Sequence, residues 1–363
     1  MKAVILCAKE KESMFPFNED RPTSLLPVAG KPVARHLVDD LLDVGVDEIK
    51  LVAKHHIEMF REEFTDPDVE VVEQEEVKGT ASAVQACERL EDDFFVVNGD
   101  VVVSRDDIET LKSAFMNAGT DCTLLGAGED RPEKFGVLSI TNDQVTDLEE
   151  KPEDPENSLV NTGIYVFSED ADDRIREISG EERSLTEAVS DMTSSDEVSF
   201  ELVTDYWVDI GKPKRLLQAD EAKRTLEQAE EVSESAQIHE DASLDGKTRV
   251  ADNAVIGPGA VIEESYIGKG VEVEPGAHIK SSTVQPGCVI SGDVKNSVLF
   301  RNTIIDACSV IKSSAVAEES DVRSGTVIRN SFIGARSYVE MNNSVRSVKF
   351  VPDARTDLSE ISK

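Results

Sequence analysis

The sequence predicts a two-domain protein in which an α/β domain is followed by a parallel β-helix. The chain has 363 residues, which is more than one typical domain needs. Its first half alternates the patterns of buried strands and helices, and its second half repeats aliphatic residues every six positions. We place the α/β domain at residues 1–225, a linker helix at about 213–235, the β-helix at 236–350 and a polar tail at 351–363.

The α/β prediction starts from an apolar run at residues 3–8, which is typical of a parallel strand buried on both faces. A helical pattern begins near Lys31. It is followed by a strand, a helix and a strand at 48–53, 56–64 and 69–73. This alternation indicates a parallel sheet with right-handed crossovers. Because such sheets bind ligands where their strands end, the loop after residue 8 should border the site.

The β-helix prediction depends on a hexapeptide repeat, with turns such as Gly257-Pro258-Gly259 between the aliphatic positions. In a β-helix the aliphatic side chains stack inward and each coil buries the face of its neighbour. The positions assigned to the repeat are Ile238, Leu244, Val250, Ile256, Ile262, Ile267, Val273, Ile279, Val298, Ile304, Val310, Val316, Val322, Ile328, Ile333, Val339 and Val345.

The composition is strongly acidic. Asp and Glu number 74 against 38 Lys and Arg, which gives a net charge of -36 and an isoelectric point near 4.4. Self-repulsion of this size destabilises a compact state unless salt screens it. Because the acidic residues occur in both halves, we expect a salt-rich, haloarchaeal cytosol. Nucleic acids and anionic membranes are not expected partners.

The cysteines predict a reducing, cytoplasmic location. Five are present, and their spacing forms no Cys-x-x-Cys motif, so we expect reduced, buried thiols. No run of apolar residues approaches the 18 or so needed for a membrane span, and no secretory leader is recognised.

Several motifs of the first 213 residues resemble those of the sugar-1-phosphate nucleotidyltransferases, the NDP-sugar pyrophosphorylases. They follow one another in that family's order. The segments are 1–17, Arg21-Pro-Thr-Ser-Leu-Leu-Pro-Val-Ala-Gly-Lys-Pro32, Gln74-Glu-Glu-Val-Lys-Gly-Thr-Ala-Ser-Ala-Val84, Asn98-Gly-Asp-Val101, Phe135-Gly-Val137, Glu150-Lys-Pro152, Asn161-Thr-Gly-Ile-Tyr165 and Trp207-Val-Asp-Ile-Gly-Lys-Pro213. The resemblance implies a Rossmann-like domain with a mixed sheet. The hexapeptide repeat of this chain is similar to the left-handed β-helix that many family members carry.

The resemblance also implies a nucleotide site. Gln74 would read a base edge, since a carboxamide offers a paired donor and acceptor. Gly79 and Thr80 would open the helix beneath the base. A structural alternative stays open, in which this segment is a polar turn with an N-cap threonine.

Sugar, phosphate and metal positions follow from the same resemblance. Gly136, Glu150 and Asn161 would contact the sugar, and Lys151 would be the catalytic lysine that holds its phosphate. Asp100 and Asp209 would hold Mg²⁺, for which carboxylate oxygens are suitable ligands.

The phosphate loop departs from the family pattern. Lys9 and Lys11 stand where the family has glycines, Ser13 where it has arginine and Thr23 where it has lysine. Side chains at the glycine positions obstruct the approach of backbone N–H groups to phosphate oxygens. Loss of one preorganised charge donor lowers a rate by roughly 10²–10³.

Three functions therefore stay open. The first is nucleotidyl transfer from an NTP to a sugar 1-phosphate. The second is a nucleotide-sugar-binding regulatory or scaffolding subunit beside an active paralogue. The third is acetyl transfer by the β-helix, for which only His239 and His278 could act as base. We also expect a homo-oligomer, a trimer or a multiple of it, or a hetero-oligomer.

Overall fold

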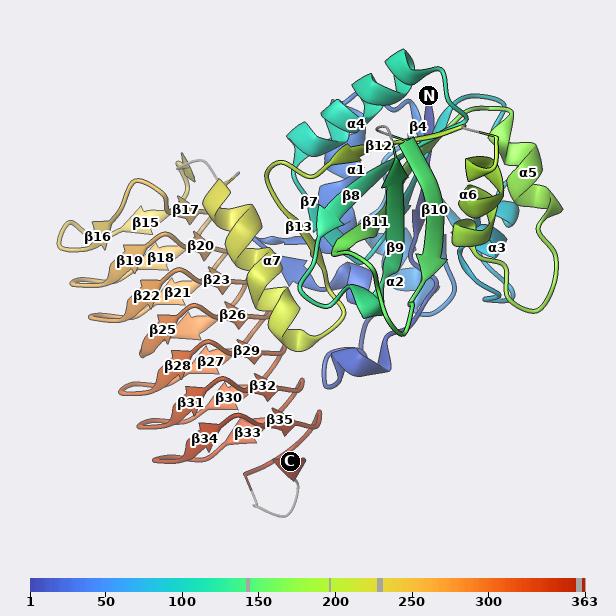
Figure 1. Cartoon of the computed structure of the whole chain (residues 1–363). Helices are drawn as coiled ribbons and strands as arrows, with labels where there is room; N and C mark the ends of the chain where they lie inside the picture. Colours follow the sequence, from blue (N-terminus) through green and yellow to red (C-terminus); the bar gives the residue numbers. More distant parts are fainter. Residues whose placement is uncertain (142–143, 196, 227–230, 357–360, 363) are drawn as a thin grey trace. The chain divides into compact units, whose positions relative to one another are not determined.

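The computed structural model describes residues 1–141, 144–195, 197–226, 231–356 and 361–362 (Figure 1). The chain forms two compact units. Unit 1 consists of Met1–Glu10 and Ala34–Asp209, and unit 2 consists of Lys11–Val33 and Ile210–Lys363. The second unit therefore includes a segment from the start of the chain, which the sequence-based boundary at residue 225 did not anticipate.

Unit 1 is built on a mixed sheet, as predicted. Four parallel strands lie in the order β5-β4-β1-β6, and β11 pairs antiparallel with β6. The bounds are β1 Lys2–Leu6, β4 Glu48–Ala53, β5 Val69–Glu73, β6 Phe94–Asn98, β8 Cys122–Gly128, β9 Gly136–Thr141, β10 Gln144–Glu150, β11 Leu159–Phe167 and β12 Val198–Leu202. The chain runs from β1 to β4 and β5 and then returns to β6 on the other side of β1. The strand order thus reverses between β1 and β6, which is where sheets of this kind bind ligands.

Helices cover the sheet of unit 1 because each has one apolar face. α6 packs against β10, and α4 packs against β8 and β12. The helices are α1 Val33–Asp43, α2 Ile57–Glu63, α3 Thr80–Gln85, α4 Arg105–Ala118, α5 Ala171–Glu177 and α6 Leu185–Thr193. No helix in the described part of the chain is long and apolar enough to cross a bilayer.

Unit 2 contains the predicted β-helix. Short parallel strands stack into three sheets, and each coil adds one strand to each sheet (Figure 1). The stacking begins at β14, Glu231–Val232, although this part was predicted to be helical. The linker helix α7 is described over Pro213–Leu226, and the rest of the predicted helix up to residue 230 lies outside the described residues.

The inward-facing aliphatic residues form one continuous core, which runs through the described coils from Val250 to Phe350. The hexapeptide pattern located most of them, but its phase was wrong at three positions. Leu299, Ile305 and Ile311 are fully buried in this core, whereas their strand neighbours Val298, Ile304 and Val310 do not belong to it. In the predicted polar tail, β36 Ile361–Ser362 pairs antiparallel with β35 Lys349–Phe350.

The N-terminal segment of unit 2 packs on the β-helix. It comprises two short 3-10 turns, Glu12–Met14 and Thr23–Leu25, and the hairpin strands β2 Pro27–Val28 and β3 Lys31–Pro32. The Phe17 ring is buried, with its centroid 5.3 Å from that of Phe300. Arg21 Nη2 lies 2.6 Å from Glu318 Oε1. Arg21, the first residue of the family-like segment Arg21–Pro32, is therefore ion-paired with the β-helix.

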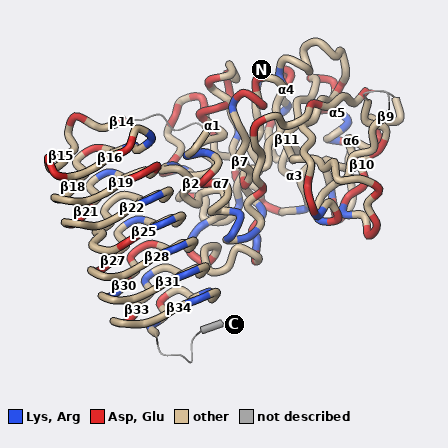
Figure 2. Tube along the Cα trace, turned by 60° about the vertical axis from the view of Figure 1, so that its left-hand side comes forward, with Lys and Arg blue, Asp and Glu red and all other residues tan. Residues whose placement is uncertain are grey.

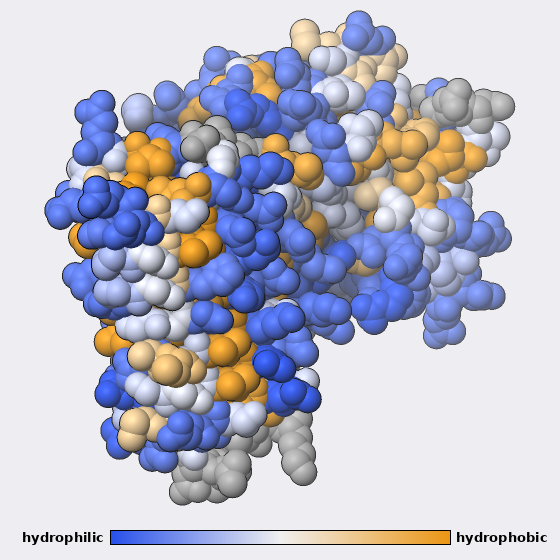
Figure 3. All heavy atoms as spheres, turned by 90° about the vertical axis from the view of Figure 1, so that its left-hand side faces the viewer, coloured by the Kyte–Doolittle hydropathy of each residue, from blue (hydrophilic) through white to orange (hydrophobic). Residues whose placement is uncertain are grey.

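The surface agrees with the acidic composition. Acidic residues occur in both units (Figure 2), and hydrophilic residues cover most of the face drawn in Figure 3. This is the distribution expected of a protein whose charge is spread along the chain.

Thiol reactivity gives a first test of the packing. Four cysteines are buried and Cys308 is exposed. Burial raises the pKa of Cys87 and of Cys288 to about 12, which leaves almost no thiolate at neutral pH. We expect one thiol per chain to react rapidly with Ellman's reagent in the native protein, and all five after denaturation. Rapid native reaction of two or more thiols would contradict the buried positions.

Candidate functional site

The candidate site lies in unit 1, where β1 and β6 end. The Gly99 N–H, directly after β6, donates to the carbonyl of Leu6 at the end of β1 (2.9 Å). Gly163 of β11 lies beside Asn98, and a Cβ added at Gly163 would be only 2.0 Å from Asn98 Nδ2. Its φ of +78° is also one that side chains disfavour. The ends of β1 and β6 and the middle of β11 are thus brought together at the point where the strand order reverses.

The three predicted sugar residues are neighbours. Gly136 and Glu150 are paired across β9 and β10. A Cβ built on Gly136 would lie 3.3 Å from Glu150 Oε2 and 3.6 Å from the Cβ of Asn161. Asn161 is fixed in turn, since its Oδ1 accepts a hydrogen bond from the Gly163 N–H (3.0 Å). The three strands β9, β10 and β11 therefore place a carboxylate and a carboxamide around one glycine.

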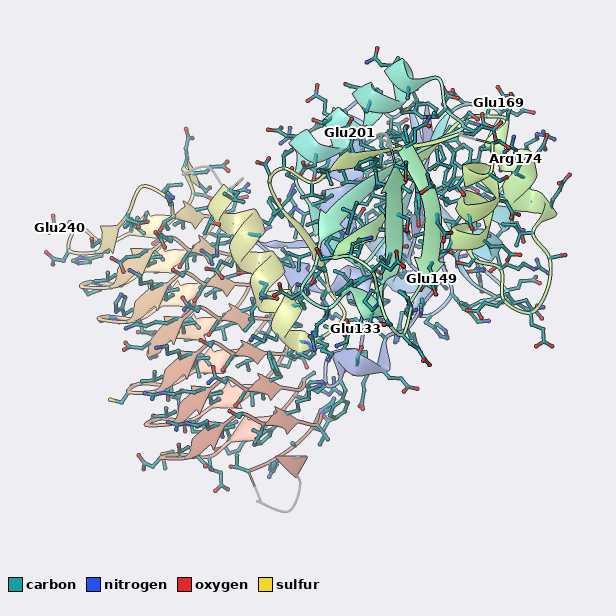
Figure 4. The ribbon with its side chains drawn as sticks, viewed as in Figure 1. Glu133, Glu149, Glu169, Arg174, Glu201 and Glu240 are labelled. Carbon is teal, nitrogen blue, oxygen red and sulfur yellow. The ribbon has the colours of Figure 1, made fainter. Side chains whose placement is uncertain are left out.

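Lys151 stands at the end of β10, one residue after Glu150. Its backbone has a left-handed φ of +49°, and its N–H donates to the Phe135 carbonyl (2.9 Å). The ammonium group is more than half exposed and lies 2.7 Å from Glu150 Oε1. Glu149, labelled on β10 in Figure 4, precedes this pair. The lysine charge is accessible beside the predicted sugar carboxylate.

Gly79 and Thr80 begin α3 and are held by the segment before α6. The Thr80 hydroxyl accepts from the Leu185 N–H (2.9 Å), and Ala81 N donates to Arg183 O (2.9 Å). Gly79 has φ +108°, and an added Cβ would lie 2.2 Å from Arg183 O. The missing side chain at Gly79 therefore allows close contact with the backbone of Arg183.

The segment at residues 183–186 links the predicted nucleotide and sugar residues. Leu185 contacts Thr80, while the hydroxyl of the next residue, Thr186, donates to Glu150 Oε2 (3.3 Å). The sequence-based analysis missed this segment. Its available signal was the pattern Ser184-x-x-Glu187, which is typical of a helix N-terminus; the Ser184 hydroxyl does accept from the Thr186 N–H.

Gln74 follows β5 and is 2% exposed. Its Nε2 donates to Ser82 Oγ (2.8 Å), and its Oε1 is buried without a hydrogen-bond partner in the described part of the chain. A buried, unpaired acceptor costs about 1–3 kcal/mol, and this oxygen is enclosed by the protein. The carboxamide is positioned by α3 and does not project into solvent.

Asp100 and Asp209 are placed close together by a two-stranded pairing. β7, Val101–Val103, runs antiparallel to β13, Trp207–Asp209, and Asp209 is opposite Val101. Asp209 is therefore next to the residue that follows Asp100. A group of three or more His, Cys, Asp or Glu side chains arranged for a metal is not found among the described residues. Two carboxylates fit Mg²⁺, which commonly takes one or two from the protein and its other ligands from phosphates and water.

Two further contacts fix β13. The indole Nε1 of Trp207 donates to the Thr162 carbonyl (3.2 Å), and its ring meets that of Phe135 edge-on, 5.6 Å between centroids. The buried Asp107 carboxylate accepts hydrogen bonds from the Thr204 N–H and hydroxyl (both 2.8 Å). The strand that carries Asp209 is thereby tied to the strand that carries Asn161.

The departures in the phosphate loop divide between the two units. Lys9 is exposed and belongs to unit 1. Lys11, Ser13 and Thr23 belong to unit 2, where the Ser13 hydroxyl donates to Gly211 O (2.6 Å) and Thr23 is 4% exposed.

The two solenoid histidines are not brought together, because His239 follows a strand of one sheet and His278 begins a strand of another.

Gly79 provides a test of this arrangement by substitution. We expect Gly79→Ala to destabilise unit 1 by about 3 kcal/mol, because the new Cβ meets a carbonyl at an unfavourable φ. Gly119→Ala is the control: it also has a positive φ, but an added Cβ meets nothing within 4 Å, so about 1 kcal/mol is expected. Urea unfolding followed by the fluorescence of Trp207, the sole tryptophan, measures unit 1. Equal losses for the two variants would contradict the Arg183 contact.

Comparisons with known proteins agree with these observations. The nucleotidyl transferase family model matches residues 2–225, and the model of the GlmU-like C-terminal hexapeptide matches residues 276–347. The bifunctional protein GlmU of Methanocaldococcus jannaschii is 33% identical over 356 residues, which cover 96% of this chain and 81% of that protein.

Two further relatives support the same grouping. The low-salt glycan biosynthesis nucleotidyltransferase Agl11 of Haloferax volcanii is 27% identical over 70% of this chain and 74% of its own. The structure of a putative glucose-1-phosphate thymidylyltransferase from Bacillus anthracis aligns with a TM-score of 0.59 and 25% identity, over 62% of this chain and 96% of the other. The chain belongs to the nucleotidyl transferase family and carries a GlmU-like hexapeptide β-helix at its C-terminal end.

Proposed function

We propose that the protein is a Mg²⁺-dependent nucleotidyltransferase that joins an NTP and a sugar 1-phosphate to form an NDP-sugar and pyrophosphate. One observation carries the proposal. Contacts through residues 183–186 link Gly79 and Thr80 to Glu150, and contacts through β11 link Asn161 to the strand of Asp209. Residues of the predicted nucleotide, sugar and metal sites thus belong to one contiguous part of unit 1.

In this reaction an oxygen of the sugar phosphate attacks the α-phosphorus of the NTP. The bond from that phosphorus to the bridging oxygen of the β-phosphate breaks, and pyrophosphate leaves with the electron pair. Such transfers depend mainly on positioning and on charge stabilisation. Lys151 would hold the attacking phosphate. Glu150 would accept hydrogen bonds from sugar hydroxyls, and Asn161 would donate hydrogen bonds to them. Asp100 and Asp209 would hold Mg²⁺, which when bound supplies positive charge against the phosphates.

A second candidate is a nucleotide-sugar-binding subunit with little or no turnover. It is favoured by the phosphate loop, in which Lys9 and Lys11 replace glycines and Arg21 is paired with Glu318 in unit 2. Such a subunit would act through assembly, either with an active paralogue or as a homo-oligomer built on its β-helix. Analytical ultracentrifugation in molar KCl would determine the size of the assembly.

The two candidates are separated by a direct assay. We expect pyrophosphate release from an NTP and a sugar 1-phosphate in molar KCl with Mg²⁺, tested for each common base and for hexose and N-acetylhexosamine 1-phosphates. EDTA should abolish it. Saturable binding of an NDP-sugar with no pyrophosphate release from any pair would favour the binding subunit and contradict the enzyme.

A further inference from the structure

A column of cations runs along one corner of the β-helix. The third residues of five successive strands in one sheet are in register, and the strands are about 4.8 Å apart, so the column is about 19 Å long. Figure 2 shows Lys and Arg repeated at this corner of the coils. The column consists of Lys280, Lys295, Lys312, Arg329 and Arg346.

Most of the column has no carboxylate partner. Lys280 is paired with Glu263, 2.9 Å away, but the other four form no ion pair with any residue in the described ranges. Like charges that face each other across neighbouring strands repel. Acidic residues are almost twice as numerous as basic ones in this chain, yet none in the described ranges pairs with these four cations. Their charge is therefore available to an external anion.

A ladder of buried serines holds the column rigid. The hydroxyls of Ser282, Ser297, Ser314 and Ser331 donate to the carbonyl oxygens of the four cations two residues earlier, at 2.7 to 2.8 Å. Each hydroxyl also accepts the N–H of the corresponding residue in the next coil, at 3.1 to 3.4 Å. The backbone that carries the charges is thus preorganised, which lowers the entropy lost on binding.

A groove borders the column. A cavity of about 550 Å³ lies between α7 and the coil corners. Its corner side is lined by Ser281, Asn296, Ser313 and Asn330, each of which directly follows a column cation and has a φ of +47° to +49°. These residues offer short hydroxyl and amide groups over four coils, so the groove is elongated and parallel to the column.

The groove also has an apolar part. Phe332 from the solenoid and Leu217 from α7 contribute to its lining, together with the polar Gln218. α7 also contributes Lys214 and Arg224 beside the acidic Asp220 and Glu221, and the column cations precede lining residues without being part of the lining. An aromatic ring beside a carboxamide suits a heterocyclic base, whose face stacks and whose edge forms hydrogen bonds. The volume falls within the usual range for small-molecule sites.

The second copy of the chain is a poorer occupant. A neighbouring solenoid would need a carboxylate column with the same spacing. The outward-facing first residues of the strands in the described coils do not form one. In the sheet that contains β18 (Val255–Ile256), they are Val255, Glu272, Val289, Ile304 and Asp321.

We propose that this groove binds a nucleoside polyphosphate, with its phosphates along the cation column and its base against Phe332 and Leu217. The site belongs to unit 2 alone and does not depend on the function proposed for unit 1.

Calorimetric titration of the full chain with ATP in 0.5 M KCl tests the proposal. We expect a site that Lys312→Gln/Arg329→Gln weakens at least tenfold, whether or not unit 1 also binds ATP. The matched control, Lys269→Gln/Arg301→Gln, removes one lysine and one arginine from other corners of the solenoid and should change the affinity of this site less than twofold. Circular dichroism would verify that both variants are folded.

The alternative outcomes are distinct. Equal weakening by both double variants would show a general charge effect and overturn the site, as would a titration in which the column variant binds like the wild type. Photocrosslinking with 8-azido-ATP should label α7 or the strand of Phe332; labelling confined to unit 1 would also overturn it. Asp100→Asn should leave this site unchanged, which separates its failure from failure of the proposed enzyme.

Discussion

Asp100→Asn and Asp209→Asn are each expected to lower the rate of pyrophosphate release by roughly 10²-fold at saturating substrates. The amide keeps the shape of the carboxylate but removes the charge that would hold Mg²⁺ against the phosphates. β13 places Asp209 opposite Val101, the residue after Asp100, so either loss should weaken the same proposed cation site. The measurement is the rate as a function of Mg²⁺ concentration, which should also show a higher half-saturating concentration.

Asp106→Asn is the matched control, because Asp106 is exposed in the first turn of α4 and makes no part of the proposed site. It should retain the wild-type rate and Mg²⁺ dependence. An unchanged Mg²⁺ dependence in both Asp100→Asn and Asp209→Asn would refute the assigned cation site.

Lys9→Gly/Lys11→Gly/Ser13→Arg is expected to raise the same rate by about 10²-fold. The two glycines would let backbone N–H groups approach the phosphates, and the arginine would add one charge donor. Thr23 is left unchanged because it is 4% exposed, and a buried ammonium there would be destabilising. Single-turnover rates measured with excess protein would show whether the chemical step is faster.

Adding Asp100→Asn to this loop variant provides its control. If the loop acts at the proposed site, the gain should disappear. A gain that persists without the carboxylate would place the activity elsewhere, and no gain at all would mean that the loop does not limit turnover.

The sequence predicted the fold well where a single periodicity dominates. The apolar strands of unit 1 and the stacked aliphatic residues of the solenoid are local patterns that burial enforces. The phase error at Val298, Ile304 and Val310 arose because each is followed by another aliphatic residue. These residues are Leu299, Ile305 and Ile311, so the period alone could not identify the inward member.

Contacts between distant segments were beyond that reasoning. Arg21 meets Glu318, 297 residues later, and no local pattern links a signature block to a β-helix coil. Residues 183–186 were missed for the same reason, because their importance lies in contacts with Thr80 and Glu150. The motifs identified which residues form the candidate site, while packing determined what each one touches.

The central claim is that unit 1 contains one site for a nucleotide sugar and a divalent cation. A crystal structure of the protein soaked with an NDP-sugar and Mn²⁺, whose anomalous signal locates the cation, tests it most directly. We expect the sugar beside Glu150 and Asn161 and the anomalous peak between Asp100 and Asp209. An NDP-sugar bound away from these residues, or a cation held by other ligands, would contradict the claim.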